Sequence, residues 1–327
     1  MKQNNFYITT PIYYPSGQPH MGHAYSSILA DVFARFKRNE NNQVFFLTGT
    51  DEHGLKIQKA AEKSNLDPLK YCDKISKVFK DLTIKLNLSN DDFIRTTEKR
   101  HHKAVNELWD RLVKSGDIYL SKYEGWYSVS DEAYYSSDEI IEKDGKKISS
   151  FSGSPVEWVE EESFFFKLSS WQDKLLDFYE KNQKFILPIS RRNEVVNFVK
   201  AGLKDLSISR TSFTWGIKVP NNDKHVIYVW LDALTNYLSA INFPNLNDDL
   251  YNSVTFPFFL PIDSANRIDD GDVQHACNHA VGDIAVTKLL INKDKQIIKY
   301  FCLADIRSRQ SMELFILLIF PLILLTG

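Results

Sequence analysis

The stretch FYITTPIYYPSGQPHMGHAYSSILADVFARFKR, residues 6–38, decides the fold. Residues 6–9 are aromatic and β-branched, a composition that favours a strand. Three prolines and a glycine then predict a loop over residues 11–19. From Ala24 onward, apolar residues recur at steps of three and four, which predicts a helix with one apolar face. The residues of that face are Ile28, Leu29, Val32, Phe33 and Phe36.

The four residues HMGH, 20–23, lie where this loop turns into the helix. In a doubly wound parallel sheet ligands bind at this place, because the unpaired N–H groups and the helix dipole favour phosphate. Gly22 allows a close backbone approach, and His20 and His23 can donate to phosphate oxygens. A metal site is the weaker interpretation, since there is no nearby cysteine and no HExxH spacing. The turn is therefore a candidate nucleotide site.

A second motif, TGTDEHG, follows a short apolar strand and occupies residues 48–54. Asp51 has the chemistry to bind a substrate ammonium, and Gly54 permits a tight turn into the next helix. Taken alone, such a turn is also compatible with simple helix capping. Two parallel strands that both end in a polar motif predict an α/β fold with a Rossmann-like parallel sheet.

Together, HMGH and TGTDEHG resemble the signatures of the methionyl-tRNA synthetases, which are class I aminoacyl-tRNA synthetases. Three later segments resemble the same family: DLSISR at 205–210, WGIKVP at 215–220 and YVWLDALTNY at 228–237. The resemblance covers roughly residues 6–250. It implies a nucleotide-binding sheet that is split by an inserted β-rich connective domain.

The resemblance also implies a reaction, in which ATP activates methionine to methionyl-adenylate and the methionyl group passes to tRNA(Met). By resemblance, His20 and His23 stabilise the phosphates of ATP, and Gly22 lies under the adenine and ribose. Asp51 holds the amino group and is supported by Arg210. ATP is then a substrate, accompanied by Mg²⁺.

The implied methionine side-chain pocket is formed by Ile12, Tyr14, Trp230, Ala233, Leu234 and Tyr237. The last four residues have the spacing i, i+3, i+4, i+7, which places them on one helix face. That spacing by itself favours an ordinary core stripe. An aromatic and aliphatic cage nevertheless suits a thioether, which is apolar, flexible and polarisable.

The resemblance divides the chain into four parts. Residues 1–115 are the first half of the catalytic domain, 116–224 the connective domain, 225–252 the start of the second half, and 253–327 a tail that does not match. Many relatives carry zinc-binding cysteines in the connective domain, after a run like YEGWY. This sequence has none there, so we predict no structural zinc.

Composition restricts the class of protein further. Cys72, Cys277 and Cys302 are far apart, which argues against a disulfide scaffold and, with no signal peptide at the N-terminus, predicts a cytoplasmic protein. The net charge of −2 means that a nucleic-acid surface must be local. The apolar run 314–325 is shorter than the ~18 residues of a membrane span, so we expect no membrane association. The pattern HxCxH at 275–279 is interpreted as chance.

The tail leaves two functional hypotheses open. The KMSKS loop that stabilises the leaving pyrophosphate in the family is absent, and the sequence after about residue 252 is interpreted as foreign or frame-shifted. The first hypothesis is a methionine-tRNA ligase. The alternative is a truncated, non-catalytic remnant that binds methionine or a nucleotide weakly at most. A simple adenylyltransferase that uses HxGH alone is disfavoured, because the match runs on to Tyr237.

Overall fold

A computed structural model describes residues 5–245, apart from 129–132, 136, 144, 184 and 188. In the C-terminal part it describes the backbone of 284–287, 300–302 and 304–305. The pattern HxCxH and the apolar run 314–325 therefore lie outside the described residues.

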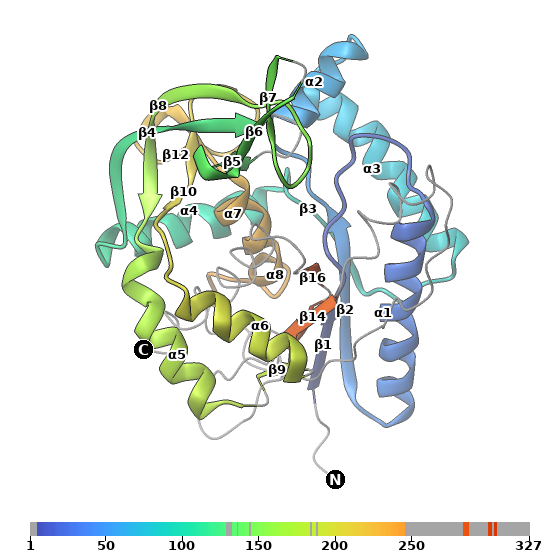
Figure 1. Cartoon of the computed structure of the whole chain (residues 1–327). Coiled ribbons are helices and arrows are strands. Elements are labelled where there is room, and N and C mark those ends of the chain that lie inside the picture. The colour runs from blue at the N-terminus through green and yellow to red at the C-terminus, as the bar shows by residue number, and fades with distance from the viewer. Residues whose placement is uncertain are drawn as a thin grey trace.

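A parallel sheet lies at the centre of the N-terminal part (Figure 1). Its strand order is β15-β1-β2-β3, with Tyr7 of β1 opposite Phe45 of β2. The strands are β1 (Asn5–Thr9), β2 (Gln43–Thr50), β3 (Asp92–Arg95) and β15 (Tyr300–Cys302). The helices between and after them are α1 (Met21–Asn39), α2 (Leu55–Lys63), α3 (Pro68–Lys85) and α4 (Lys99–Lys114). The α/β fold class and the parallel sheet predicted from the sequence are confirmed.

Helix α1 packs with only part of the face that its apolar spacing indicates: Leu29 and Phe33 are partly buried against the cluster that contains Ala30, and the other three are exposed. Ile28, Val32 and Phe36 are 44%, 56% and 53% exposed. The buried face consists of small and polar residues, namely Gly22, Ser26, Ser27, Ala30, Asp31 and Ala34. Small side chains allow the helix to lie close to the sheet and the preceding loop, and this close approach decides which face is buried.

After α4 the pairing changes from parallel to antiparallel. Strands β4 (Ile118–Ser128) and β8 (Glu157–Phe166) form a long ladder that begins with Ile118 opposite Phe166. Strand β4 continues without a break through Gly125, which lies opposite Val159. The ladder is extended by β5 (Ala133–Tyr135) and β10 (Leu206–Ser207).

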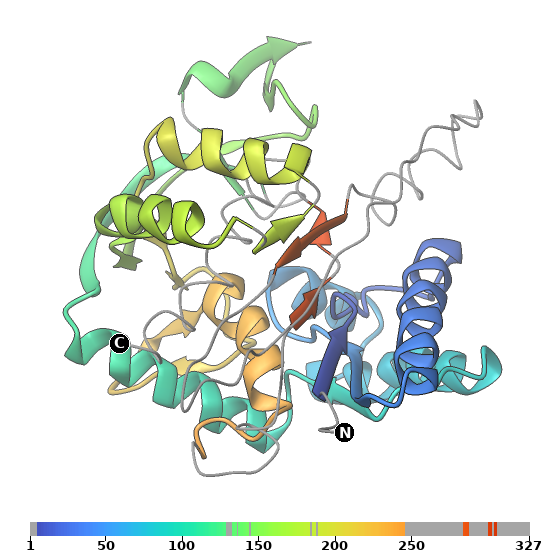
Figure 2. The same cartoon turned by 90° about the horizontal axis from the view of Figure 1, so that it is seen from below.

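A hairpin and two helices complete this β-rich part. The hairpin of β6 (Ile140–Lys143) and β7 (Lys146–Ser149) projects from the molecule in Figure 2. Helices α5 (Gln172–Lys181) and α6 (Ile189–Lys200) follow β8. Strand β9 (Ile186–Leu187), between them, pairs with β14 (Ile284–Thr287), which also pairs with β16 (Ala304–Asp305). The domain boundaries given by the resemblance stay predictions.

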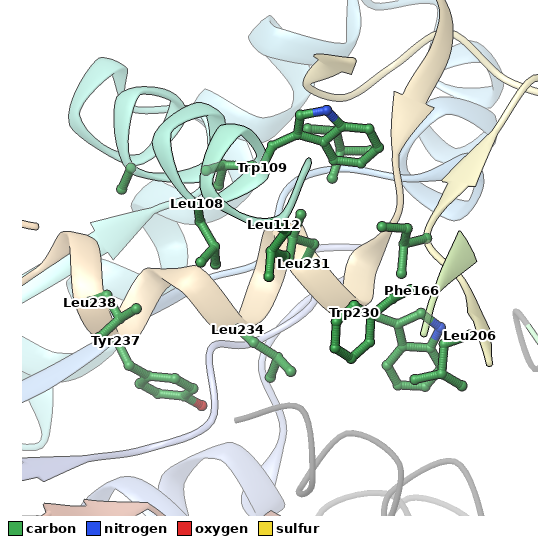
Figure 3. Close-up of a cluster of buried hydrophobic side chains, with 14 of the residues drawn as sticks. Leu108, Trp109, Leu112, Phe166, Leu206, Trp230, Leu231, Leu234, Tyr237 and Leu238 are labelled. Carbon is green, nitrogen blue, oxygen red and sulfur yellow. The ribbon is translucent and has the colours of Figure 1, made fainter. Parts of the chain in front are cut away.

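The segment 209–239 returns to the core. Strands β11 (Ser209–Arg210), β12 (Lys218–Val219) and β13 (Asn222–Ile227) form a small sheet. Beyond it, residues 229–239 form three short helical pieces, α7 (Val229–Asp232), η3 (Ala233–Thr235) and α8 (Asn236–Ser239). Figure 3 shows Leu231 beside Leu112 of α4, while Leu234 and Tyr237 point to the opposite side. The hydroxyl of Tyr7 donates to the carbonyl of Tyr237 at 2.9 Å, which ties this segment to β1.

Candidate active site

Two histidines cap the first turn of α1. His20 is the N-cap, and its Nδ1 accepts a hydrogen bond from the backbone N–H of Gly22 at 3.1 Å. In return, the Nδ1 of His23 accepts from the backbone N–H of His20 at 3.0 Å. This is a reciprocal capping box built from imidazoles instead of a hydroxyl and a carboxylate. The two rings lie 3.8 Å apart between centroids.

The cap determines which nitrogen of each neutral ring carries the proton. Because each Nδ1 is an acceptor, the proton of each neutral ring is on Nε2, which is left as a donor. Burial, with a further effect of His20, lowers the pKa of His23 to about 4. His23 is therefore neutral at pH 7. A neutral donor at a helix N-terminus suits an anion that acquires charge during a reaction.

The loop after β1 joins this cap to the end of β2. Tyr13 forms a bridge with Thr50, in which its N–H donates to Gly49 and its carbonyl accepts from the N–H of Asp51, both at 2.9 Å. Its hydroxyl is shared with Ser26 and Ser27 of α1 at 2.8 Å each. The bridge places the neighbours of Tyr13, the predicted pocket residues Ile12 and Tyr14, beside the start of the motif that contains Asp51.

The buried side chain of Glu52 anchors the second motif. Its carboxylate accepts from Arg95 through both Nε and Nη2, at 2.7 and 2.9 Å, and from the hydroxyls of Ser76 and Thr97. Burial raises the pKa of this carboxyl, but the donors outweigh it and hold the pKa below its usual value. The indole N–H of Trp215 donates to the backbone carbonyl of Glu52 at 2.6 Å. Arg95, the two hydroxyls and the indole of Trp215 thus hold the second motif in place.

His53, one residue further, contacts the C-terminal segment. Its Nδ1 lies 2.7 Å from Oδ2 of Asp232, the last residue of α7. The other carboxylate oxygen of Asp232 lies 2.8 Å from Nε2 of His101 on α4. All three side chains are buried. Asp232 therefore joins the second motif, α4 and the segment that contains the predicted pocket residues.

Arg210 is fully buried beneath the same segment. Its guanidinium donates to the hydroxyl of Ser207 at 2.6 Å and to the carbonyl of Ser209 at 2.7 Å. It lies 3.7 Å from the centroid of the Tyr228 ring, and its Nε lies 3.7 Å from a carboxylate oxygen of Glu161. The pairing of Arg210 with Asp51 that the resemblance implies stays a prediction.

The remaining predicted pocket residues lie on α7, η3 and α8. Trp230, Ala233, Leu234 and Tyr237 are each 7–8% exposed. Trp230, Leu234 and Tyr237 belong to the largest buried apolar cluster, and the partly buried Ile12 packs against that cluster. The helical spacing predicted for residues 230–237 is present, although it includes one turn of 3-10 helix.

A path of contacts therefore links the predicted residues. The ring of His23 lies 4.8 Å from that of Tyr13 between centroids, and Tyr13 pairs with the backbone of Asp51. Two residues further, His53 binds Asp232 in the segment 229–239. Sequence reasoning assigned no role to Tyr13, Glu52, His53, His101 or Asp232. One available signal was Asp232 itself, because an acidic residue inside the apolar run YVWLDAL needs a buried partner.

A parallel sheet with a polar motif at the carboxyl end of two adjacent strands is the arrangement of a nucleotide-binding α/β protein. The profile of the family described as tRNA synthetases class I (M) matches residues 6–254. The chain belongs to this family of class I tRNA synthetases.

Curated relatives give the same assignment. The chain is 61% identical over 243 residues to the methionine–tRNA ligase of Rickettsia typhi, which covers 74% of this chain and 47% of the relative. It is 54% identical over 250 residues to the methionine–tRNA ligase of Brucella suis, covering 76% of this chain and 48% of the relative. The chain thus spans about half the length of the curated relatives it matches.

A solved structure agrees with these relatives. Mycobacterium tuberculosis methionyl-tRNA synthetase in complex with methionyl-adenylate superposes with a TM-score of 0.74 at 49% identity. The superposition covers 77% of this chain and 49% of that one.

Within the described residues, no three or more His, Cys, Asp or Glu side chains are grouped so that they could hold a metal ion. Among the helices that the structure describes, none is long and apolar enough to span a membrane.

Proposed function

We propose that the chain carries the adenylation site of a methionine–tRNA ligase. In this reaction the methionine carboxylate attacks the α-phosphate of ATP, pyrophosphate leaves, and methionyl-adenylate forms. The methionyl group then passes to the terminal adenosine of tRNA(Met). The observation that carries the proposal is the path of contacts from the histidine cap to Asp51. It is supported by the 49% sequence identity to a synthetase whose structure was solved with methionyl-adenylate.

We assign the phosphates to the start of α1. The Nε2–H groups of His20 and His23 donate to phosphate oxygens as charge develops on them. Gly22 leaves the space beside the cap open for the adenine and ribose. Magnesium, which binds through substrate phosphates more often than through protein cages, accompanies ATP.

We assign methionine to the region between the first loop and the segment 229–239. Asp51 binds the ammonium group, and Arg210 keeps that carboxylate ionised. The thioether lies among Ile12, Tyr14, Trp230, Ala233, Leu234 and Tyr237. The apolar character of these side chains supports this assignment, because a thioether gains most from burial among aromatic and aliphatic groups.

The test is methionine-dependent exchange of pyrophosphate into ATP by the purified chain. Leucine and isoleucine are the substrate controls. D51N is expected to abolish exchange, whereas D81N, a change in an exposed ion pair with Lys77, is expected to leave it unchanged. Exchange that is equal for methionine and leucine, or that persists in D51N, would contradict the proposal.

The second candidate function is a non-catalytic fragment that binds methionine or a nucleotide weakly. The observation that favours it is the span of about half the relatives' length. Calorimetry separates the two: methionine binding without exchange supports the fragment, and binding with exchange supports the ligase. The proposal also includes transfer to tRNA(Met), the division of the chain into four parts and a cytoplasmic location.

A further inference from the structure

A buried carboxylate joins three parts of the chain that are far apart in sequence. Asp232 is 1% exposed, and its two oxygens lie 2.7 Å from the ring of His53 and 2.8 Å from the ring of His101. These contacts span 179 and 131 residues. Each oxygen has its own histidine, so the carboxylate is held in one orientation.

The charges around this carboxylate favour its ionised form. Burial raises the pKa of Asp232, but the charge and hydrogen bonds of His53 and His101 outweigh burial and hold the pKa well below its usual value. An ionised carboxylate accepts, so both histidine ring N–H groups donate to it. The ring of His102, 5.5 Å from that of His53, has its pKa lowered to about 4, first by burial and then by His53, and is neutral.

Each of the two histidines has a further contact of its own. His53 follows Asp51 by two residues, and its ring contacts the indole of Trp215 at 5.6 Å between centroids. His101 is fully buried on α4, where its other ring nitrogen lies 3.0 Å from the hydroxyl of Ser239. Asp232 itself lies between Trp230 and Ala233 in the sequence.

We propose that Asp232 is a positioning residue. It lies on the segment 229–239, one wall of the methionine site, joins that wall through His53 to the motif of Asp51, the other wall, and holds the segment on α4 through His101. The inference rests on the proposed function, because it presumes that methionine binds between Asp51 and the segment 229–239. Asp232 touches neither methionine nor ATP in this assignment. Replacement of Asp232 should therefore weaken the binding of methionine, which contacts both walls, more than the binding of ATP, which lies at the start of α1.

The test compares D232N with a control change in another buried carboxylate. Asp31 is 7% exposed and accepts from the backbone N–H and hydroxyl of Ser89 and from Arg35. It lies on α1 about 16 Å along the helix from His20. D31N therefore removes a comparable buried charge at a distance from both proposed substrates.

Calorimetry gives the Kd of methionine and of ATP for the wild-type chain and both variants. We expect D232N to raise the Kd of methionine about tenfold, a size typical of the loss of an outer supporting contact. The Kd of ATP should stay within twofold, and D31N should change neither constant. H101Q leaves the contact between Asp232 and His53 in place. It should raise the Kd of methionine less than D232N does and should also leave the Kd of ATP unchanged. If D232N does not fold, H101Q tests the inference in its place.

Three results would overturn the inference. The first is a folded D232N that binds methionine as tightly as the wild-type chain. The second is an equal loss of methionine and ATP affinity, since a general loss of stability would explain it. The third is a wild-type chain that binds ATP but no methionine, and only this result also removes the proposed function.

Discussion

Replacing Gly49 with alanine tests the geometry of the central sheet. Gly49 of β2 lies opposite Ile94 of β3. A Cβ at this position would lie 2.0 Å from the carbonyl oxygen of Ile94 and 2.7 Å from its Cγ2. The first of these atoms belongs to the backbone, so no rotation of a side chain relieves the contact.

The magnitude follows from the distance that must be gained. Ordinary contact begins near 3.4 Å, so β2 and β3 must separate locally by well over an ångström. Hydrogen bonds between the strands, which need about 3.2 Å or less, then break. Overpacking of this kind costs about 1–3 kcal/mol, and each broken hydrogen bond adds about 1 kcal/mol. We therefore expect G49A to lower the free energy of unfolding by about 3 kcal/mol or more.

The assay is urea unfolding followed by far-UV circular dichroism, with G17A as the control. A Cβ at Gly17 would meet nothing within 4 Å, so G17A should leave the midpoint unchanged. G49A should lower the midpoint with little change in slope. It should also weaken methionine binding, because the carbonyl of Gly49 accepts from Tyr13 in the first loop. A G49A chain within 1 kcal/mol of the wild type would refute the strand spacing on which this reasoning depends.

Three further predictions concern buried titratable groups. E52Q should lower the free energy of unfolding at pH 7 by about 1.5–3 kcal/mol, because Arg95 loses the buried one of its two carboxylate partners and keeps only Asp73. Folding lowers the pKa of Glu52. Its contribution to the free energy of unfolding is therefore fully present above the pKa of the unfolded chain, about 4.3, and is lost as the pH falls below that value. The difference between E52Q and wild type in urea unfolding should therefore narrow below that pH, and a constant difference would contradict the assignment. The His23 ring should titrate by NMR near pH 4, and a midpoint at 6 or above would exclude its burial. Burial and the nearby Glu52 carboxylate raise the pKa of Cys72, so iodoacetamide should leave this thiol unmodified at pH 8 until urea is added, as mass spectrometry of the labelled chain can establish.

Local patterns were sufficient to predict β1, β2 and the motif that follows each of them. They did not predict β3, or β15, which lies in the part of the sequence interpreted as a non-matching tail and pairs with β1. The strand before HMGH and the strand before TGTDEHG pair in parallel, because the predicted helix between them forms a strand–helix–strand unit. The buried face of α1 was not predictable in this way. Ser26 and Ser27 are buried because the Tyr13 hydroxyl satisfies them, and only the fold brings that hydroxyl there.

The candidate site was predictable in its motifs and not in its supporting contacts. Asp51 and the two histidines stand in short motifs whose chemistry is readable from the letters. The pairing of Asp232 with His101 connects residues 131 positions apart, and no local spacing specifies it. The charge of Asp232 within an apolar run indicated that some partner exists, but it gave no information on which one.

The return of the segment 229–239 to α4 has a consequence during synthesis of the chain. Leu112 of α4 and Leu231 of α7 pack side by side in the core (Figure 3). A ribosome that adds 5–20 residues per second needs on the order of 10 s to proceed from one to the other. For that time the apolar face of α4 has no native partner from this segment. Binding by a chaperone that recognises exposed apolar segments is then expected in a defined window, which opens as α4 leaves the ribosome and closes once residue 239 has emerged.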